Sequence, residues 1–315
     1  MTSLDSNDKT KTWAHYAAEG FELELEEELR TSSRQEILAR YGRLFLTRGP
    51  AYDLAWAQNT WIEPEEVPIQ SITDAARKLR ARGLKWTAYS FQLYRRTALI
   101  SEKLPKLREE RYAFLAPLPQ KKPGHWTLLD PNHMLVCTET TSPLPHGEIH
   151  FQENKSAPSR AYLKLWELFT LHGVRPPRPD ETCLDLGASP GGWTWVLAQL
   201  GCTVKAVDRS PLALSIAKMK NVSFQKGNAF TLDPRSIGRI DWLFSDVICA
   251  PEKSFQLIQK WIDSGLVRNL VCTIKFKGKT DHEITRRLRA IPGAKIKHLF
   301  HNKHELTWWR TDSNF

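Results

Sequence analysis

The amino-acid sequence predicts an α/β fold, in which a doubly wound parallel sheet follows an amino-terminal α+β domain. From residue 180 onward, short apolar runs alternate with amphipathic stretches, as they do in consecutive βαβ units. The first of these runs leads directly into a glycine-dense turn at residues 187–192. Asp208 closes the next run, at the distance of about 20 residues that nucleotide-cofactor sites show in such sheets.

Each element of the second half follows from its local pattern. The runs with strand character are residues 182–186, 203–207, 222–224, 240–245 and 270–274. A helix is expected from Gly191, directly after the glycine-dense turn. Ser210 and Pro211 predict a second helix, with serine as its N-cap and proline at its first position, and Pro251 predicts a third in the same way.

The end of the chain predicts a hairpin at one edge of the sheet. Residues 295–299 and 305–310 are strand-like runs, and the polar segment 301–304 joins them. Trp308 and Trp309 point to opposite sides of the second run, so we expect one of the two rings to lie in the core.

The first half has a different pattern of strand-like and helical segments, which predicts an α+β domain. Strand-like runs at 13–18 and 43–47 flank an acidic helix at 21–29, and proline-rich stretches at 117–123 and 142–146 are typical of loops. A domain boundary is expected near Lys155-Ser156, which divides the chain into domains at residues 1–155 and 156–315.

Charge favours a nucleic-acid partner. The chain has 45 Lys and Arg residues against 35 Asp and Glu residues, a formal net charge of +10. Such an excess favours polyanions through phosphate contacts, although it also increases solubility without any partner. Neither the first ten residues nor any later run resembles a signal peptide or a bilayer span, and the five cysteines are scattered. We therefore expect a cytoplasmic protein, without a membrane partner or a metal site.

The glycine-dense turn discriminates between cofactor classes. A dinucleotide site uses G-x-G-x-x-G, whereas this turn reads Gly187-Ala-Ser189-Pro190-Gly191-Gly192. Ser189 and Pro190 occupy positions at which the backbone would have to approach a pyrophosphate closely, so this turn disfavours a pyrophosphate. A cofactor without phosphates, S-adenosyl-L-methionine, fits better, and a turn without any ligand is the alternative.

Five segments of the second half carry a resemblance to a known family. They are Ala157-Pro-Ser-Arg-Ala-Tyr-Leu-Lys164, Asp185-Leu-Gly-Ala-Ser-Pro-Gly-Gly-Trp193, Ser245-Asp246, Thr273-Ile-Lys275 and His304-Glu305-Leu-Thr307. Together they resemble the RNA 2'-O-ribose methyltransferases of the FtsJ class, and within it the RlmM family, which methylates a cytidine ribose in bacterial large-subunit ribosomal RNA. The resemblance implies a Rossmann-like methyltransferase domain. Glu19-Gly-Phe-Glu-Leu-Glu24 and Leu54-Ala-Trp-Ala-Gln58 extend it weakly to an amino-terminal ferredoxin-like and THUMP-like region.

The resemblance implies a catalytic tetrad of Lys164, Asp246, Lys275 and Glu305. A ribose 2'-hydroxyl must lose its proton as it attacks a methyl group, and Lys275 is the candidate base. The pKa of a free lysine is about 10.4, so we expect the site to lower the pKa of Lys275 by burial or by the neighbouring Lys164. Asp246 would orient an ammonium group and the methyl donor, and Glu305 would hold the second lysine.

The resemblance also implies a set of cofactor-binding residues: Ser159, Asp185, Gly187, Ser189, Pro190, Gly191, Gly192, Asp208, Asn228 and Asp246. Two positions depart from the family. Asn228 stands where the family usually has an aspartate that accepts a hydrogen bond from the adenine amine; an amide oxygen can accept the same bond without charge. Ser189 stands where the related chains often have cysteine.

Basic residues near the predicted site suit RNA, namely Lys275, Lys277, Lys279, Arg286, Arg287 and Arg289, and a second group occurs at Lys78, Arg80, Arg82, Lys85, Arg95 and Arg96. The expected partner is RNA, either ribosomal RNA or a ribosomal assembly intermediate.

Two alternative functions stay open at this point. One is a catalytically silent RNA-binding or ribosome-assembly protein, against which the complete tetrad argues. The other is a methyltransferase acting on a base or on protein, which the sequence after residue 245 does not favour.

Overall fold

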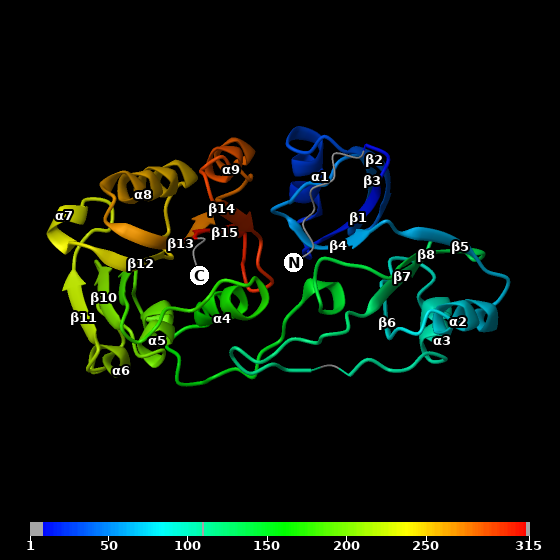
Figure 1. The fold of residues 1–315 in the computed structure, drawn as a ribbon, viewed down its shortest axis with the longest axis horizontal. Helices are drawn as coiled ribbons and strands as arrows, with labels where there is room; N and C mark the ends of the chain where they lie inside the picture. The colour runs from blue at the N-terminus through cyan, green and yellow to red at the C-terminus, as the bar shows by residue number, and fades with distance from the viewer. Residues whose placement is uncertain (1–8, 109, 313–315) are drawn as a thin grey trace. The chain divides into compact units, whose positions relative to one another are not determined.

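The structure is a computed structural model that describes residues 9–108 and 110–312. Residues 1–8, part of the segment in which no signal peptide was expected, lie outside the described part. The chain divides into two compact units, one of residues 1–112 and 117–150 and one of residues 113–116 and 151–315 (Figure 1).

The first unit begins with a four-stranded antiparallel sheet in the order β2-β3-β1-β4. Its elements are β1 (Thr12–Ala17), α1 (Glu22–Thr31), β2 (Glu36–Tyr41), β3 (Leu44–Arg48) and β4 (Ala57–Ile62). This order is that of a split βαβ motif, with one helix instead of the two of a complete ferredoxin-like unit. The acidic helix α1 buries one carboxylate, because Glu28 accepts hydrogen bonds from the backbone N–H groups of Ala55 and Trp56 at 2.8 and 3.0 Å.

A second four-stranded sheet of this unit has the order β5-β8-β7-β6. Its elements are β5 (Glu65–Pro68), α2 (Ile72–Arg80), β6 (Trp86–Ala88), α3 (Tyr94–Ser101), β7 (Gly124–Leu128), β8 (His133–Cys137) and the short 3-10 helix η1 (Pro145–Gly147). Tyr16 and Trp61 of the first sheet share a buried cluster with Leu135 and Cys137 of the second, so one core joins the two sheets.

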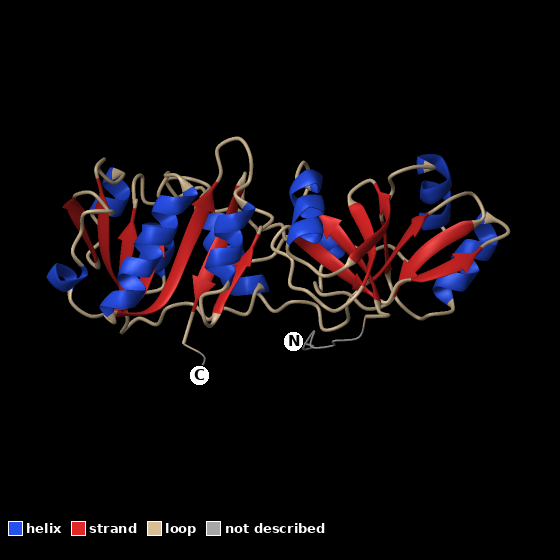
Figure 2. Cartoon of the chain, turned by 90° about the horizontal axis from the view of Figure 1, so that it is seen from above, coloured by secondary structure: helices blue, strands red, loops and turns tan. Residues whose placement is uncertain are grey.

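The second unit is built around a seven-stranded sheet in the order β11-β10-β9-β12-β13-β15-β14 (Figure 2). Its strands are β9 (Thr182–Leu186), β10 (Thr203–Asp208), β11 (Val222–Lys226), β12 (Ile240–Ser245), β13 (Val267–Lys275), β14 (Ala294–Lys297) and β15 (Glu305–Arg310). The first five are parallel, and β15 runs antiparallel to both of its neighbours. The α/β fold predicted from the sequence is confirmed.

Helices cover both faces of this sheet. They are α4 (Tyr162–Leu171), α5 (Gly192–Gln199), α6 (Leu214–Ala217), α7 (Pro234–Ile237), α8 (Pro251–Ser264) and α9 (His282–Arg289), with α4 and α5 on one face and α8 and α9 on the other (Figure 1). Among the helices of the described residues, none is both long and apolar enough to cross a membrane.

The tail forms the predicted hairpin, but its last strand is not at the edge, because β15 inserts between β13 and β14. Both edges of β15 are therefore hydrogen-bonded to neighbouring strands. Trp308 donates its indole N–H to the carbonyl of Leu288 on α9, while the ring of Trp309 lies 5.9 Å from that of His172. Both tryptophans are buried, so the expectation that one of them lies in the core is confirmed, and the second ring is buried as well.

The helix predicted from Ser210-Pro211 begins later than expected. Its N-cap is Ala213, because the preceding residues are held extended against the glycine-dense turn. The hydroxyl of Ser189 donates to the carbonyl of Pro211 at 2.8 Å, and the Ala213 N–H donates to the carbonyl of Pro190 at 2.9 Å. Proline at the start of α8 follows the prediction.

Candidate active site

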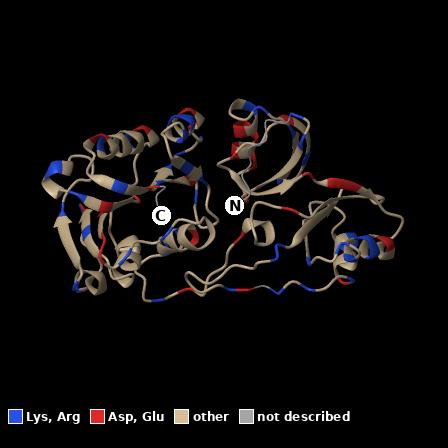
Figure 3. Ribbon diagram, viewed as in Figure 1, with Lys and Arg blue, Asp and Glu red and all other residues tan. Residues whose placement is uncertain are grey.

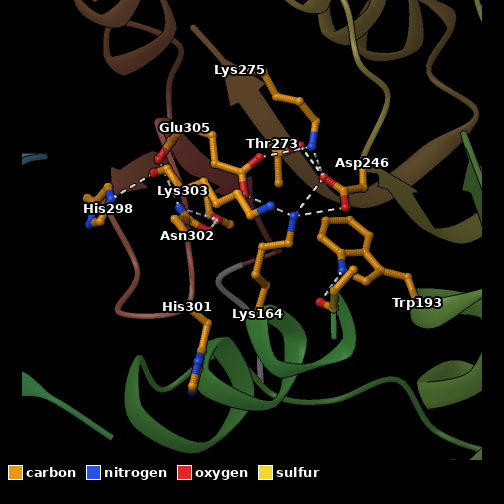
Figure 4. A network of polar contacts seen from close by, with 12 residues as sticks. Lys164, Trp193, Asp246, Thr273, Lys275, His298, His301, Asn302, Lys303 and Glu305 are labelled. Atoms are coloured by element: carbon orange, nitrogen blue, oxygen red, sulfur yellow. Dashed lines mark hydrogen bonds and ion pairs between the residues drawn. The ribbon is translucent and has the colours of Figure 1, made fainter. Parts of the chain in front are cut away.

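Four charged side chains, Lys164, Asp246, Lys275 and Glu305, meet at the carboxyl edge of the seven-stranded sheet (Figure 4). Lys164 is the third residue of α4, and Asp246 directly follows β12. Lys275 ends β13 and Glu305 begins β15, and these two residues are directly paired in the antiparallel register. The topology therefore brings together residues that are up to 141 positions apart in the chain.

The four groups form a closed ring of alternating charge. The Lys164 ammonium donates to both oxygens of Asp246 at 2.8 Å and to Glu305 Oε1 at 3.0 Å. Lys275 Nζ donates to Asp246 Oδ1 at 2.7 Å and to Glu305 Oε2 at 2.9 Å. Two cations and two carboxylates give a formal charge of zero, which reduces the cost of burying them together.

The ring sets the protonation of its members. Burial raises the pKa of Asp246, but the attraction of Lys164 and Lys275 outweighs it, and the net shift is downward. Burial lowers the pKa of Lys275, but Asp246 and Glu305 outweigh it, and the net shift is upward. The expectation that the site lowers the pKa of Lys275 is therefore wrong. The charge of Lys164 was expected to lower this pKa, but Asp246 and Glu305 neutralise that charge. In this state Lys275 is an ammonium group at neutral pH.

Two further residues contact the ring. The buried Thr273 hydroxyl donates to Asp246 Oδ1 at 2.7 Å, so this oxygen accepts hydrogen bonds from three donors. The Lys164 ammonium lies 5.6 Å from the ring centroid of Trp193, whose indole N–H donates to the carbonyl of Ala161. Thr273 precedes Lys275 by two positions on one strand, a spacing that places both on the same face and could have identified the threonine from the sequence.

A buried carboxylate holds the loop that leads to Glu305. Glu167 of α4 accepts hydrogen bonds from the N–H groups of Phe300 and His301 at 2.7 and 3.0 Å. The Asn302 amide then donates to the carbonyl of Glu305 at 3.1 Å. Sequence reasoning missed Glu167 and Asn302, because their partners are loop backbone atoms that no motif marks.

A cavity of about 470 Å³ lies beside the ring, and Asp246 belongs to both. Of the residues predicted to bind a cofactor, Gly187, Ser189, Asp208, Asn228 and Asp246 line the cavity; its remaining lining residues are Val207, Arg209, Gly227, Ala229, Phe230, Val247, Ile248, Cys249, Ala250 and Lys253. A mixed apolar and polar lining of this size suits a ligand with a flat base and a polar tail.

Polar groups around the cavity are held by backbone contacts. Asp208 accepts hydrogen bonds from the N–H groups of Ser189 and Ser210 at 2.9 and 2.8 Å. The Asn228 side-chain oxygen accepts from the Phe230 N–H at 3.1 Å. Each oxygen retains a second lone pair, so both side chains can still accept a hydrogen bond from a ligand.

The glycines at 187, 191 and 192 allow close packing of the turn. Gly187 has a φ of +77°, and a Cβ there would lie 2.6 Å from the Val247 side chain. A Cβ on Gly192 would lie 2.4 Å from the Ser159 hydroxyl. Ser159 thus contacts the start of α5, and it lies outside the cavity lining, as do Pro190, Gly191 and Gly192.

Asp185 is fully buried beneath the turn and does not line the cavity. Its Oδ2 accepts a hydrogen bond from the Thr194 hydroxyl at 2.6 Å, while its Oδ1 makes none with any described residue. Burial raises the pKa of Asp185 to about 7. The hydrogen bond from Thr194 lowers this pKa, and the negative charge of the neighbouring Asp246 raises it.

Replacing Asp185 with asparagine should change how stability depends on pH. The folded state retains a proton that the unfolded chain releases above about pH 4, so the free energy of unfolding falls as pH rises from about 4 to 7. Asp185→Asn removes this titration. Between pH 5 and 8, we expect the variant to gain about 2–3 kcal/mol relative to the unmodified protein. Urea unfolding of both proteins at several pH values tests this, and parallel pH profiles would contradict it.

The described residues contain no group of three or more His, Cys, Asp or Glu side chains that could hold a metal ion.

Comparison with known proteins shows what most of the second unit is similar to. Residues 157–281 match the model of the FtsJ-like methyltransferase family. The protein named Ribosomal RNA large subunit methyltransferase M from Halorhodospira halophila is 36% identical over 172 residues, which cover 52% of this chain and 50% of that protein. Proteins of the same name are 35% identical over 179 residues in Pseudomonas aeruginosa, with 52% and 50% covered, and 32% identical over 189 residues in Azotobacter vinelandii, with 55% and 53% covered.

The chain spans about half the length of the curated relatives it matches. The family match includes Lys164, Asp246 and Lys275, and it ends before Glu305. Residues 157–281 are therefore similar to the FtsJ-like methyltransferase family, which confirms the resemblance that the sequence motifs indicated.

Proposed function

We propose that this chain transfers a methyl group from S-adenosyl-L-methionine to a ribose 2'-hydroxyl of RNA. The proposed substrate is ribosomal RNA or a ribosomal assembly intermediate, and the proposed compartment is the cytoplasm. The observation that carries the proposal is the ring of two lysines and two carboxylates beside the cavity. This arrangement offers a proton acceptor together with groups that orient it. The relatives named for methylation of large-subunit ribosomal RNA support the substrate class.

The cavity residues fit the cofactor. Asp208 at the end of β10 is placed to accept hydrogen bonds from ribose hydroxyls, and Asn228 from an adenine amine. Asp246 lines the same cavity and is placed to face the cationic methyl donor. The cofactor supplies an electrophilic methyl group on a positively charged sulfur. Asp185, Ser159, Pro190, Gly191 and Gly192 would support the shape of the turn.

Lys275 is the proposed general base. Two of the three ammonium N–H groups donate to Asp246 and Glu305, which leaves the third position for the 2'-hydroxyl of the substrate. In the neutral amine, the lone pair occupies that third position and takes the proton of the 2'-hydroxyl while the oxygen bonds to the methyl carbon and the carbon–sulfur bond breaks. Lys164 and the two carboxylates keep Lys275 in place, and Thr273 orients Asp246.

The test is transfer of a labelled methyl group to unmodified RNA. The protein is incubated with S-adenosyl-L-methionine labelled in its methyl group and with ribosomal RNA that lacks its own modifications, and the label is then located by nuclease digestion. Label on a ribose 2'-oxygen is the expected result. Label on a base would overturn the reaction type, and cofactor binding without any label would favour the silent RNA-binding alternative.

The pH dependence of the reaction follows from the raised pKa of Lys275. Because the base must be the neutral amine, its fraction increases tenfold with each pH unit below that pKa. We expect kcat/KM to rise about tenfold per pH unit from pH 7 to 9, without a plateau. A plateau beginning near pH 8 would contradict this and would instead agree with a lowered pKa. Binding of the RNA, measured at each pH, controls for changes in affinity.

A further inference from the structure

A second cavity of about 470 Å³ lies in the first unit and has no role in the proposed transfer. Strands of both sheets contribute Tyr16, Arg40 and Ala88 to its lining, and the helices and loops beside them add Glu22, Arg43, Tyr89, Phe91, Tyr94 and His146. Because one buried cluster joins the two sheets, the walls of this cavity are fixed relative to each other. Its volume lies within the range of ligand-binding pockets.

One wall of this cavity is aromatic. The rings of Tyr89 and Phe91 stack with centroids 6.0 Å apart, and those of Tyr16 and His146 with centroids 4.9 Å apart. Tyr94 is 67% exposed, although its hydroxyl donates to the carbonyl of Phe91 at 3.0 Å and so restrains its ring. A restrained and exposed aromatic ring at a cavity is a platform on which a nucleic-acid base can stack.

Two guanidinium groups lie at the same cavity. Arg43 is held over the Tyr16 ring at 4.5 Å, and its Nε donates to the carbonyl of Ala17. Arg40 is more exposed, and it donates to the carbonyl of Gly42 and to Glu26. Burial, together with the Arg43 charge, lowers the pKa of His146 to about 4, so this ring is neutral at pH 7. The local cations are therefore the two arginines, which suit phosphate oxygens and the acceptor atoms of a base. Each of them pairs with one carboxylate, Arg40 with Glu26 and Arg43 with Glu148, and Glu22 also lines the cavity.

The shape of the cavity depends on a tight turn. Gly42 has a φ of +61°, and a Cβ there would lie 2.4 Å from the Tyr89 hydroxyl. The N–H of Arg43 donates to that hydroxyl at 2.7 Å. The turn is thus locked to the aromatic wall, which keeps the guanidinium groups and rings in place before any ligand binds.

The helices that pack on the second sheet carry further basic residues. Tyr94 begins α3 and is followed by Arg95 and Arg96, and α2 carries Arg77, Lys78 and Arg80 (Figure 3). Asp74 and Glu65 neutralise part of this charge. Basic side chains in the same unit as an aromatic cavity fit a polymer with phosphates better than a free nucleotide.

We propose that this cavity binds one unstacked nucleotide of a single-stranded RNA segment, with its base against Tyr94 and its phosphate at Arg40. The choice of RNA as the polymer rests on the proposed function. The site itself lies within the first unit and needs none of the four charged residues of the candidate active site.

The test compares variants of the full chain by fluorescence anisotropy with labelled single-stranded RNA. Tyr94→Ala should weaken binding about tenfold, because loss of one base–aromatic stack costs roughly 1–3 kcal/mol. Tyr94→Phe keeps the ring and should bind within about twofold of the unmodified protein. Leu99→Ala is the matched control, since Leu99 is an exposed apolar residue of the same helix that does not line the cavity.

A second measurement separates stacking from general charge attraction. With a blunt RNA duplex of the same sequence, Tyr94→Ala should bind like the unmodified protein, because paired bases cannot enter the cavity. Arg40→Gln should reduce the salt dependence of single-strand binding by about one phosphate contact. Unchanged single-strand binding by Tyr94→Ala, or an equal loss on the duplex, would overturn the proposal. A tenfold loss for Tyr94→Ala in a protein that methylates nothing would support this site and reject the proposed reaction.

Discussion

Lys275→Met should reduce kcat for methyl transfer by about 10²- to 10⁴-fold, the usual contribution of a general base. Methionine has a similar shape but can neither accept nor hold the proton of the 2'-hydroxyl. Lys164 would still bridge Asp246 and Glu305, and Lys275 is the more exposed of the two lysines, so we expect the fold and the cofactor cavity to persist. Single-turnover transfer with saturating RNA measures the effect, and calorimetric binding of S-adenosyl-L-methionine shows whether the cavity is intact.

Lys277→Met is the matched control for this experiment. Lys277 lies two positions further along the chain, is exposed and has no contact with the ring. Its loss removes the same charge and can raise KM for RNA, but it should leave kcat unchanged. If Lys275→Met kept kcat within about tenfold of the unmodified protein, Lys275 would not be the base.

Lys164→Met should lower the stability of the second unit by about 3–5 kcal/mol, because it removes a buried cation from two buried carboxylates. We expect thermal unfolding of this unit to shift down by roughly 6–20 °C. The loss should be smaller at acidic pH, where protonation of Asp246 removes the unpaired charge. Calorimetric scans at neutral and acidic pH measure both effects.

The double variant Lys164→Met with Glu305→Gln is the control for this stability change. It removes one carboxylate charge together with the lysine, so Lys275 again balances Asp246. We expect the double variant to unfold at a higher temperature than Lys164→Met alone. A single variant that unfolds at the temperature of the unmodified protein would mean that the ring does not stabilise the fold.

Local signals in the sequence predicted most elements of the second unit. Alternation of apolar runs with amphipathic stretches predicted β9, β10, β12 and β13, because burial of a parallel strand requires a continuous apolar segment. The late start of α6 was not predicted. Ser210 and Pro211 have the chemistry of a helix start, but hydrogen bonds to Ser189 and Pro190 compete with it, and these partners are close only in the folded chain.

The sequence by itself indicated the family that residues 157–281 resemble, a cofactor class that suits the turn, and the four charged residues that we propose for catalysis. Their convergence depended on the tertiary structure, because the register between β13 and β15 pairs Lys275 with Glu305, while the start of α4 brings Lys164 to both carboxylates. The direction of the pKa shift of Lys275 was likewise a tertiary property. It depends on whether the nearest charges in space are carboxylates or another lysine, and a pKa responds to distance through space and not to separation along the chain.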